Sequence, residues 1–397
     1  MSNKAIVAGV GMIPFTKPGA SESYDVMGST AARRALIDAG LDYGKVQQAY
    51  VGYVYGDSTC GQAALYEVGL SGIPIFNVNN NCSTGSSALY LARQAVESGM
   101  TDCALALGFE QMNPGALGSV FDDRTNPLGR FSDEMSGLQG YDEKAPFAAQ
   151  FFGGAAREHM KRYGTRPETL AKIRAKASRH AAANPLAIFN KEVTEEEVLA
   201  TPMIFDPLTR LQCCPPTCGA AAAVVCSEAF AKAHGLRTEV FIAAQAMTTD
   251  FDSTFDAHDM RKVVGYDMAK AAAEQVYEEG GVAPEDIRVC ELHDCFTANE
   301  LITYEALGLA PEGGAEQFIL DGNNTYGGRC VTNPSGGLLS KGHPLGATGL
   351  AQCYELVSQL RGTAEARQVP GVNLALQHNL GLGGACVVTL YKSQSAA

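Results

Sequence analysis

The residue of this chain best placed for covalent chemistry is Cys82, which follows three asparagines and precedes a Ser-Thr-Gly run. Residues 73–78 have the apolar character of a short buried strand, and the apolar positions after Cys82 recur with helical spacing to about Gly99. A thiol at such a strand-to-helix turn lies beside free backbone N–H groups and the positive end of the helix dipole. Both lower a thiol pKa and can hold an oxyanion, which favours a nucleophile. A small buried residue at a tight turn is the open alternative.

Three polar segments of the second half follow apolar runs, where strands should end. The first holds His293 and Cys295, whose side chains share one face if the chain is extended. The second places His343 between a glycine and a proline, which favours a positioned imidazole that takes the Cys82 proton or holds an oxyanion. In the third, Gly383 would allow close backbone approach, so its N–H could serve an oxyanion hole. The alternatives are incidental loop residues, a core histidine and an ordinary sheet turn.

The other cysteines and histidines give weaker signals. Twelve cysteines are too sparse for a disulfide scaffold in 397 residues, and no CxxC pair recurs with zinc spacing. Residues 213–218, Cys-Cys-Pro-Pro-Thr-Cys, lack a second pair or a nearby histidine, so we expect no metal site. This cysteine usage fits a reducing, intracellular compartment. His378 ends an apolar run and could line a site, but the sequence assigns it no role.

The charge balance restricts the partners. The formal net charge of −13 argues against nucleic acid. Residues 157–180 depart from this balance, with eight Lys or Arg residues against two glutamates. They predict either a landing surface for a polyanion such as a nucleotide-bearing thiol, or a solvated basic helical face. No apolar run approaches ~20 residues, so we expect no membrane span. Neither terminus carries a signal peptide or peroxisomal tripeptide, which predicts a cytoplasmic protein.

Short apolar runs alternate with helical patterns along the chain, which predicts an α/β fold. The opening strand, residues 5–10, runs into a Gly-Val-Gly sequence, but Pro14 falls where a dinucleotide-binding motif needs its third glycine and helix. Patterns of the first half recur in order in the second, so two similar halves with facing turns would build one site. The matching pairs are 46–53 with 287–294, 84–85 with 348–349, and 103–108 with 374–380.

Four segments together carry a resemblance to a known family. They are Asn-Asn-Asn-Cys-Ser-Thr-Gly at 79–85, His-Asp-Cys-Phe at 293–296, residues 333–343, and Gly-Leu-Gly-Gly at 381–384. With them the chain resembles the thiolase superfamily and, within it, thiolases of the sterol carrier protein 2/X type, over nearly its whole length. This implies the thiolase fold, two similar βαβαβαββ halves in five α-β-α-β-α layers with an inserted loop domain. The expected parts are an N-terminal half at 1–118 completed by about 213–240, a loop domain for CoA and substrate at 119–212, and a C-terminal half at 241–397.

The resemblance implies a role for each candidate. Cys82 would accept the acyl group, and His343 would activate it and line an oxyanion hole together with His293. Most thiolases carry a second catalytic cysteine in a C-terminal Cys-x-Gly, where this chain has Gly-Leu-Gly. The sterol carrier type has it in the His-Asp-Cys-Phe block, so Cys295 would be the general acid/base. Backbone N–H groups of Cys82 and Gly383 would form a second oxyanion hole.

The predicted activity is thiolytic cleavage of a 3-ketoacyl-CoA to a shortened acyl-CoA plus acetyl-CoA or propionyl-CoA, by covalent ping-pong chemistry. Such a reaction serves fatty acid β-oxidation or sterol side-chain degradation. The resemblance also implies a homodimer that binds acyl-CoA and uses coenzyme A as co-substrate, with no permanently bound cofactor. The alternatives are a retro-aldolase or condensing enzyme on the same fold, and a non-catalytic acyl-CoA or lipid-binding protein. Both thiols and both histidines argue against these alternatives.

Two departures from the family pattern qualify this expectation. Cys218 stands where the family often has Asp, which we expect to alter a loop contact only. No lipid-carrying domain follows Tyr391, which argues against lipid transfer by this chain. Acyl chain length, branching and sterol preference depend on the region of about 115–150, whose conformation the sequence does not predict.

Overall fold

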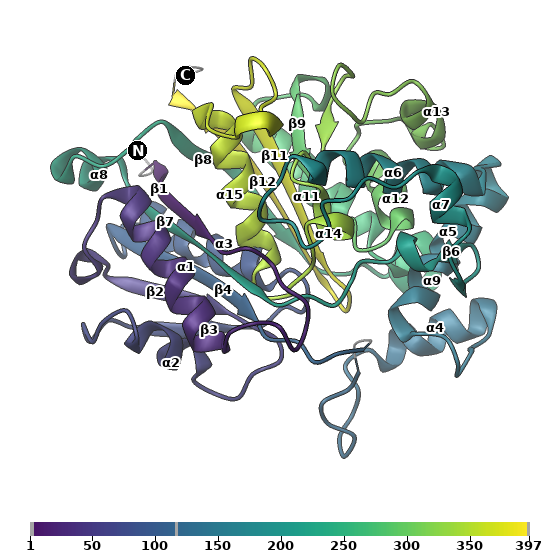
Figure 1. Ribbon diagram of the computed structural model, residues 1–397, viewed down its shortest axis with the longest axis horizontal. Coiled ribbons are helices and arrows are strands. Elements are labelled where there is room, and N and C mark those ends of the chain that lie inside the picture. Colours follow the sequence, from purple (N-terminus) through teal and green to yellow (C-terminus); the bar gives the residue numbers. More distant parts are fainter. Residues whose placement is uncertain (1–3, 116–117, 395–397) are drawn as a thin grey trace.

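The computed structural model describes residues 4–115 and 118–394, in which strands and helices alternate as the α/β prediction requires (Figure 1). The strands are β1 (Ala5–Met12), β2 (Gln48–Gly52), β3 (Ile75–Val78), β4 (Cys103–Glu110), β5 (Met203–Phe205), β6 (Leu208–Thr209), β7 (Gly219–Ser227), β8 (Val240–Thr248), β9 (Val289–Glu291), β10 (Val331–Thr332), β11 (Leu374–Gly381) and β12 (Ala385–Ser393). The longer helices are α1 (Tyr24–Ala39), α3 (Thr84–Glu97), α4 (Gly129–Gln139), α5 (Phe147–Tyr163), α6 (Pro167–Ala182), α11 (Tyr266–Gly280), α12 (Thr297–Ala306) and α15 (Thr348–Arg361). The short helices are α2 (Cys60–Tyr66), α7 (Glu195–Leu199), α8 (Glu228–His234), α9 (Ser253–Asp256), α10 (Met260–Val263), α13 (Ala315–Leu320) and α14 (Gly337–Ser340).

The main sheet is built from two similar halves. Its strand order is β10-β9-β11-β12-β8-β1-β7-β4-β2-β3, so β3-β2-β4-β7-β1 is matched by β10-β9-β11-β12-β8. In each half the outer three strands pair in parallel and the others antiparallel. The halves join at two residue pairs, Ala5 with Ile242 and Ile6 with Phe241. The repeat predicted from the sequence is therefore structural, since β2, α3 and β4 correspond to β9, α15 and β11.

Helices α3 and α15 pack against each other and against strands of both halves, so they form a middle layer at the centre of the molecule (Figure 1). Helix α1 covers the outer face of the first half, and α11 covers that of the second. The two central helices approach closely at glycines, because a Cβ at Gly85 would lie 2.7 Å from the Gly346 oxygen and one at Gly349 would lie 2.2 Å from Ser86 Oγ. This arrangement gives the five layers that the resemblance implies.

The chain between β4 and β7 leaves the first half and packs on the second. Helices α5 and α6 contact α12, and Figure 1 shows α4 to α7 gathered on that side of the molecule. Phe151, Leu170 and Leu301 belong to one buried apolar cluster that joins these helices. The inserted segment therefore packs against α12, the helix that follows β9 in the chain.

Some elements differ from the prediction. The strand expected to be buried at 73–78 is the edge strand β3, and Phe76 is 48% exposed because no strand of the described residues pairs with its outer side. Helix α11 starts at Tyr266, since Gly265 has a φ of 100° that separates this helix from α10. Between β4 and α4 the described residues form no helix or strand. No helix of the described residues is long and apolar enough to cross a membrane.

Candidate active site

The structure brings three of the predicted residues together from both halves. Cys82 lies just before α3, His293 follows β9, and His343 lies just before α15. The Cys82 Sγ and one ring nitrogen of each histidine all lie within 4.8 Å of one another. The two imidazole rings meet edge to face, with centroids 5.0 Å apart. The facing turns of the repeat therefore bring these three residues together.

Cys295 lies two residues after His293, in the neighbourhood of this group. Its residue is 5% exposed, and its carbonyl oxygen accepts a hydrogen bond from the Cys214 N–H at 2.9 Å. Burial raises the pKa of the Cys295 thiol well above its usual value, and the charges of Cys214 and Cys82 raise it further. Cys295 is therefore a protonated thiol in the neighbourhood of Cys82, together with a third thiol at Cys214.

Gly383 lies on the turn between β11 and β12, where its φ of 97° suits glycine. This turn packs against the loop of Cys82, because Asn81 Nδ2 donates to the Leu382 oxygen at 2.9 Å. A Cβ at Gly381 would lie 2.3 Å from the Asn80 oxygen. The turn and the nucleophile loop are thus held in contact.

The hydrogen bonds of His343 define which of its nitrogens is basic. Nδ1 lies 2.7 Å from Thr348 Oγ1, whose own hydrogen is donated to the Pro344 oxygen at 2.9 Å. Nδ1 must therefore carry the hydrogen and donate it to Thr348. Nε2 is buried without a hydrogen-bond partner among the described residues, so it presents a free lone pair. That atom can accept a proton from Cys82.

His293 has the opposite tautomer. Its Nδ1 lies 3.0 Å from Asn379 Nδ2, which is a donor, so Nδ1 accepts and the ring hydrogen is on Nε2. The amide orientation is consistent, since Asn379 Nδ2 also donates to the Cys82 oxygen at 3.1 Å and Oδ1 accepts from Ser86 Oγ at 2.8 Å. His293 can therefore donate to an oxyanion, while His343 acts as a base.

The resting site is electrically neutral, contrary to the expectation that the helix end lowers the thiol pKa. Burial, followed by the charge of Glu110, raises the pKa of Cys82 to about 12. Burial also lowers the pKa of His343 to about 3 and that of His293 well below its usual range. Desolvation outweighs the backbone hydrogen bond at Cys82, which lowers the pKa of the thiol. The thiolate must therefore form by proton transfer to His343 during the attack.

The same tautomers argue against a metal ion. A thiol and two imidazole nitrogens within 4.8 Å resemble a zinc ligand set. Ligation through His293 Nδ1 would displace the bond from Asn379, and ligation through Nε2 would require the ring hydrogen to move to Nδ1, which breaks the same bond. The arrangement suits proton transfer better than coordination.

Some residues at the site carry little signal in the sequence. Asn379 Nδ2 donates hydrogen bonds to the Cys82 oxygen and to His293 Nδ1. His378 Nδ1 accepts a hydrogen bond from the His293 N–H at 3.4 Å. The shared signal is a polar residue at the end of a core strand, here β11. The segment 213–218 contacts two of the loops of the site. Cys213 forms a β-bridge with Phe296, and Thr217 Oγ1 accepts a hydrogen bond from the His343 N–H at 3.2 Å.

The eight basic residues at 157–180 are divided between the surface and the interior, with Lys161, Arg162, Arg166 and Arg179 exposed. Arg174 and Lys176 are buried, where Arg174 donates to Ser340 Oγ at 2.7 Å and Lys176 pairs with Glu300 at 2.5 Å. Further ion pairs are Arg162 with Glu158 and Asp259, Arg166 with Glu316, and Lys172 with Glu195. Four of the eight basic residues, Arg162, Arg166, Lys172 and Lys176, therefore form ion pairs with acidic residues.

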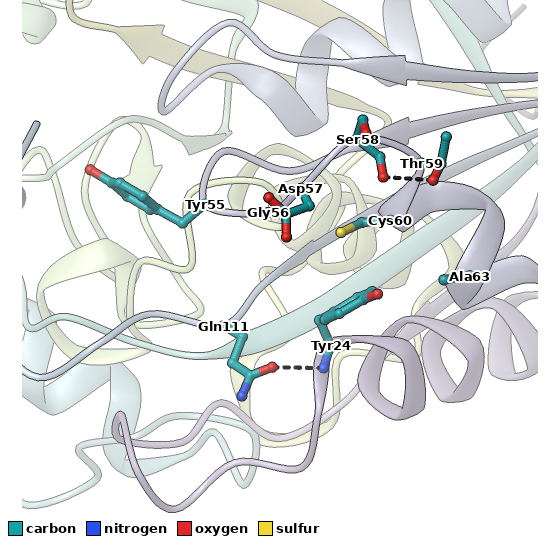
Figure 2. Close-up of a pocket in the computed structure, with 9 residues that line it drawn as sticks. All are labelled: Tyr24, Tyr55, Gly56, Asp57, Ser58, Thr59, Cys60, Ala63 and Gln111. Carbon is teal, nitrogen blue, oxygen red and sulfur yellow. Dashed lines mark hydrogen bonds between the residues drawn. The ribbon is translucent and has the colours of Figure 1, made fainter. Parts of the chain in front are cut away.

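A cavity of about 310 Å³ lies outside this group of residues, beside the loop between β2 and α2 (Figure 2). Its lining includes Tyr24, Cys60 and Gln111, and Figure 2 shows the Tyr24 N–H donating to Gln111 Oε1 at 3.0 Å. None of the predicted catalytic residues lines it.

Comparison with known proteins identifies the class. The family model for the thiolase N-terminal domain matches residues 5–229, and that for the thiolase C-terminal domain-like region matches 251–391. The chain belongs to the thiolase family and is an acyl-CoA acyltransferase, which confirms the fold and the resemblance.

One curated relative and two solved structures show how similar this chain is to individual proteins. Sterol carrier protein 2 of Oryctolagus cuniculus is 56% identical over 393 residues, 98% of this chain and 72% of the relative. The solved structure of an Ltp2-ChsH2(DUF35) aldolase has a TM-score of 0.82 at 25% identity and covers 98% of both chains. Human mitochondrial 3-ketoacyl-CoA thiolase in complex with CoA has a TM-score of 0.74 at 18% identity, covering 99% of this chain and 98% of that one.

Proposed function

We propose that this acyltransferase cleaves 3-ketoacyl-CoA with coenzyme A, giving a shortened acyl-CoA and acetyl-CoA or propionyl-CoA. The observation that carries the proposal is the group of Cys82, His343 and His293, with atoms within 4.8 Å and complementary tautomers. Coenzyme A is the co-substrate, and no cofactor is held permanently. The complex of the human thiolase with CoA supports this choice of substrate class.

In the first half-reaction, Cys82 gives its proton to His343 Nε2 and its sulfur attacks the 3-keto carbon. The developing oxyanion meets the backbone N–H groups of Cys82 and Gly383. The bond between C2 and C3 then breaks, leaving an acyl thioester on Cys82 and an enolate. The enolate oxygen lies against the Nε2–H groups of His293 and of the now protonated His343. Cys295 protonates the enolate carbon, a role that suits a thiol whose raised pKa keeps it protonated.

In the second half-reaction, the Cys295 thiolate removes the proton of the coenzyme A thiol. The sulfur of coenzyme A attacks the acyl-Cys82 thioester, and Cys82 leaves and recovers its proton from His343. Every residue then returns to its initial state. Two half-reactions joined by a covalent intermediate predict ping-pong kinetics.

Steady-state kinetics test this proposal. Initial rates at several concentrations of 3-ketoacyl-CoA and coenzyme A should give parallel double-reciprocal lines, and Cys82→Ala should abolish thiolysis. Intersecting lines, or a C82A variant with measurable thiolysis, would rule out the covalent route. A panel of straight-chain, 2-methyl-branched and sterol-derived substrates would define whether the enzyme serves fatty acid β-oxidation or sterol side-chain degradation.

A retro-aldolase is the second candidate, because an aldolase is among the similar solved structures. Such an enzyme on this fold does not need the Cys82 nucleophile. If C82A still cleaves a 3-hydroxyacyl-CoA while thiolysis is absent in the unmodified enzyme, the aldolase function holds instead. Tight binding of acyl-CoA without turnover would indicate a carrier.

We propose a homodimer that joins through the β3 edge. The exposed apolar side chains near this edge include Phe76, Tyr66 and Leu70, at 48%, 56% and 82% exposure. Light scattering of the purified protein should give twice the chain mass, and Phe76→Asp should lower it. A monomeric unmodified protein would contradict the proposal.

The remaining expectations concern the domains and the compartment. We propose that residues 119–212 act as a loop domain that contacts coenzyme A, between the halves at 1–118 (with 213–240) and 241–397. All twelve cysteines are free thiols, which supports a reducing, cytoplasmic location. Hydrogen exchange with and without coenzyme A should show protection within 119–212.

A further inference from the structure

Glu110 is a buried carboxylate that no step of the proposed mechanism uses. It is the last residue of β4 and is 0% exposed. Its two oxygens accept hydrogen bonds from the backbone N–H groups of Tyr55 and Gly346, both at 2.9 Å, and of Val54 at 3.1 Å. No Lys, Arg or His of the described residues forms an ion pair with it. Burial of a charge without an ion-pair partner is costly in free energy, so a functional role for Glu110 is worth seeking.

These donors belong to segments that meet at the site. Gly346 lies three residues after His343, and Val54 and Tyr55 follow β2. A Cβ at Gly346 would lie 2.3 Å from the Phe109 oxygen, so the loop of His343 is pressed against the end of β4. Glu110 therefore ties the loop that carries the base to the half that carries the nucleophile.

The charge of Glu110 also acts on the nucleophile. Burial raises the pKa of Glu110 to about 7, and its three backbone hydrogen bonds oppose this. The charge of Glu110 acts on two titratable groups, Tyr55 from the loop after β2 and Cys82 from the loop before α3. Its charge raises the pKa of both Cys82 and Tyr55, as burial does.

We propose that Glu110 is a positioning residue for the Cys82–His343 pair: its carboxylate, bonded to the N–H groups of Gly346, Val54 and Tyr55, fixes the loop of His343 against the half that carries the nucleophile. A negative charge held at this place also opposes loss of the Cys82 proton before substrate arrives. This inference rests on the proposed function for its catalytic consequence. Its effect on the thiol does not depend on which acyl substrate the enzyme uses. A protonated resting thiol is protected against alkylation and oxidation, because the thiolate is the reactive form.

Two substitutions separate the parts of this role. Glu110→Gln keeps the size but removes the charge, and its amide offers one acceptor oxygen where the carboxylate offers two. We expect kcat to fall about tenfold or more with KM little changed. Alkylation of Cys82 by iodoacetamide at pH 8 should become about threefold to tenfold faster, because the opposing charge is gone. Glu110→Asp keeps the charge but shortens the reach, so kcat should fall without faster alkylation.

Glu355→Gln is the matched control, since Glu355 is also buried and pairs with Arg367 at 3.1 Å. It should change neither readout by more than about twofold. The proposal is overturned if E110Q keeps the unmodified kcat, if its alkylation is not accelerated, or if E355Q reproduces both effects. Should E110Q fail to fold, E110D carries the test, and accelerated alkylation in E110D overturns the role of the charge. Alkylation is measured without substrate, so failure of the thiolase proposal leaves this test intact.

Discussion

Thr348→Val tests how the fold prepares His343 as a base. Threonine and valine have nearly the same shape, so the change removes one oxygen and little else. In the structure this oxygen accepts the His343 Nδ1–H at 2.7 Å and donates to the Pro344 oxygen at 2.9 Å. Without it, the buried N–H loses its acceptor, and the tautomer with a basic Nε2 is no longer fixed.

The magnitude follows from the cost of an unsatisfied buried donor, about 1–3 kcal/mol. If that cost appears in the transition state, where His343 carries a full positive charge, kcat falls about 5-fold to 160-fold. KM should change little, because Thr348 contacts the Nδ1 side of the His343 ring, away from the free Nε2. The assay is the initial rate of thiolysis at saturating substrate, with circular dichroism to confirm folding.

Two further variants make the result decisive. Thr348→Ser retains the hydroxyl and should recover most of the activity. In a His343→Asn background, adding T348V should cost almost nothing further, because both changes act through the same ring. A folded T348V with kcat within threefold of the unmodified enzyme, or a T348S as weak as T348V, would refute the assignment of His343 as the base.

The other predictions concern the same site and the buried ion pair between Lys176 and Glu300. Because the pKa of Cys82 is raised to about 12, its alkylation rate should rise about tenfold per pH unit from pH 7 to 9, and a plateau below pH 9 would contradict the neutral resting site. Asn379→Leu removes the donor to His293 Nδ1, so kcat should fall ~10-fold or more in a pH-independent manner, and unchanged kinetics would show that the tautomer of His293 does not matter. Lys176→Met leaves the buried Glu300 without its ion-pair partner, so denaturant unfolding should show a loss of about 3–5 kcal/mol in the free energy of unfolding, and a loss below about 1 kcal/mol would contradict a stabilising role for this ion pair.

The sequence predicts part of this site and misses the rest for a physical reason. Cys82, His293, Cys295 and His343 are recognisable because reactive residue types follow apolar runs at turns, where strands and helices end. The repeat was also visible, since both halves bury the same elements in the same order. Whether the turns face one another depends on the order of strands in the sheet, which the sequence does not state.

The supporting residues could not be found in this way. Glu110, Thr348 and Asn379 are ordinary polar residues until the fold defines which atoms they face. The basic segment shows the same limit, because Lys176 pairs with Glu300, more than a hundred positions away. The prediction that the pKa of the Cys82 thiol is lowered was wrong for a related reason, since burial and the charge of Glu110 are properties of the folded chain.

The most direct test of the covalent mechanism is mass spectrometry of the protein mixed with a 3-ketoacyl-CoA in the absence of coenzyme A. The proposed mechanism predicts an acyl group on the peptide that contains Cys82, which disappears when coenzyme A is added. Turnover of the substrate without any acyl group on Cys82, or an acyl group on Cys295 instead, would contradict it.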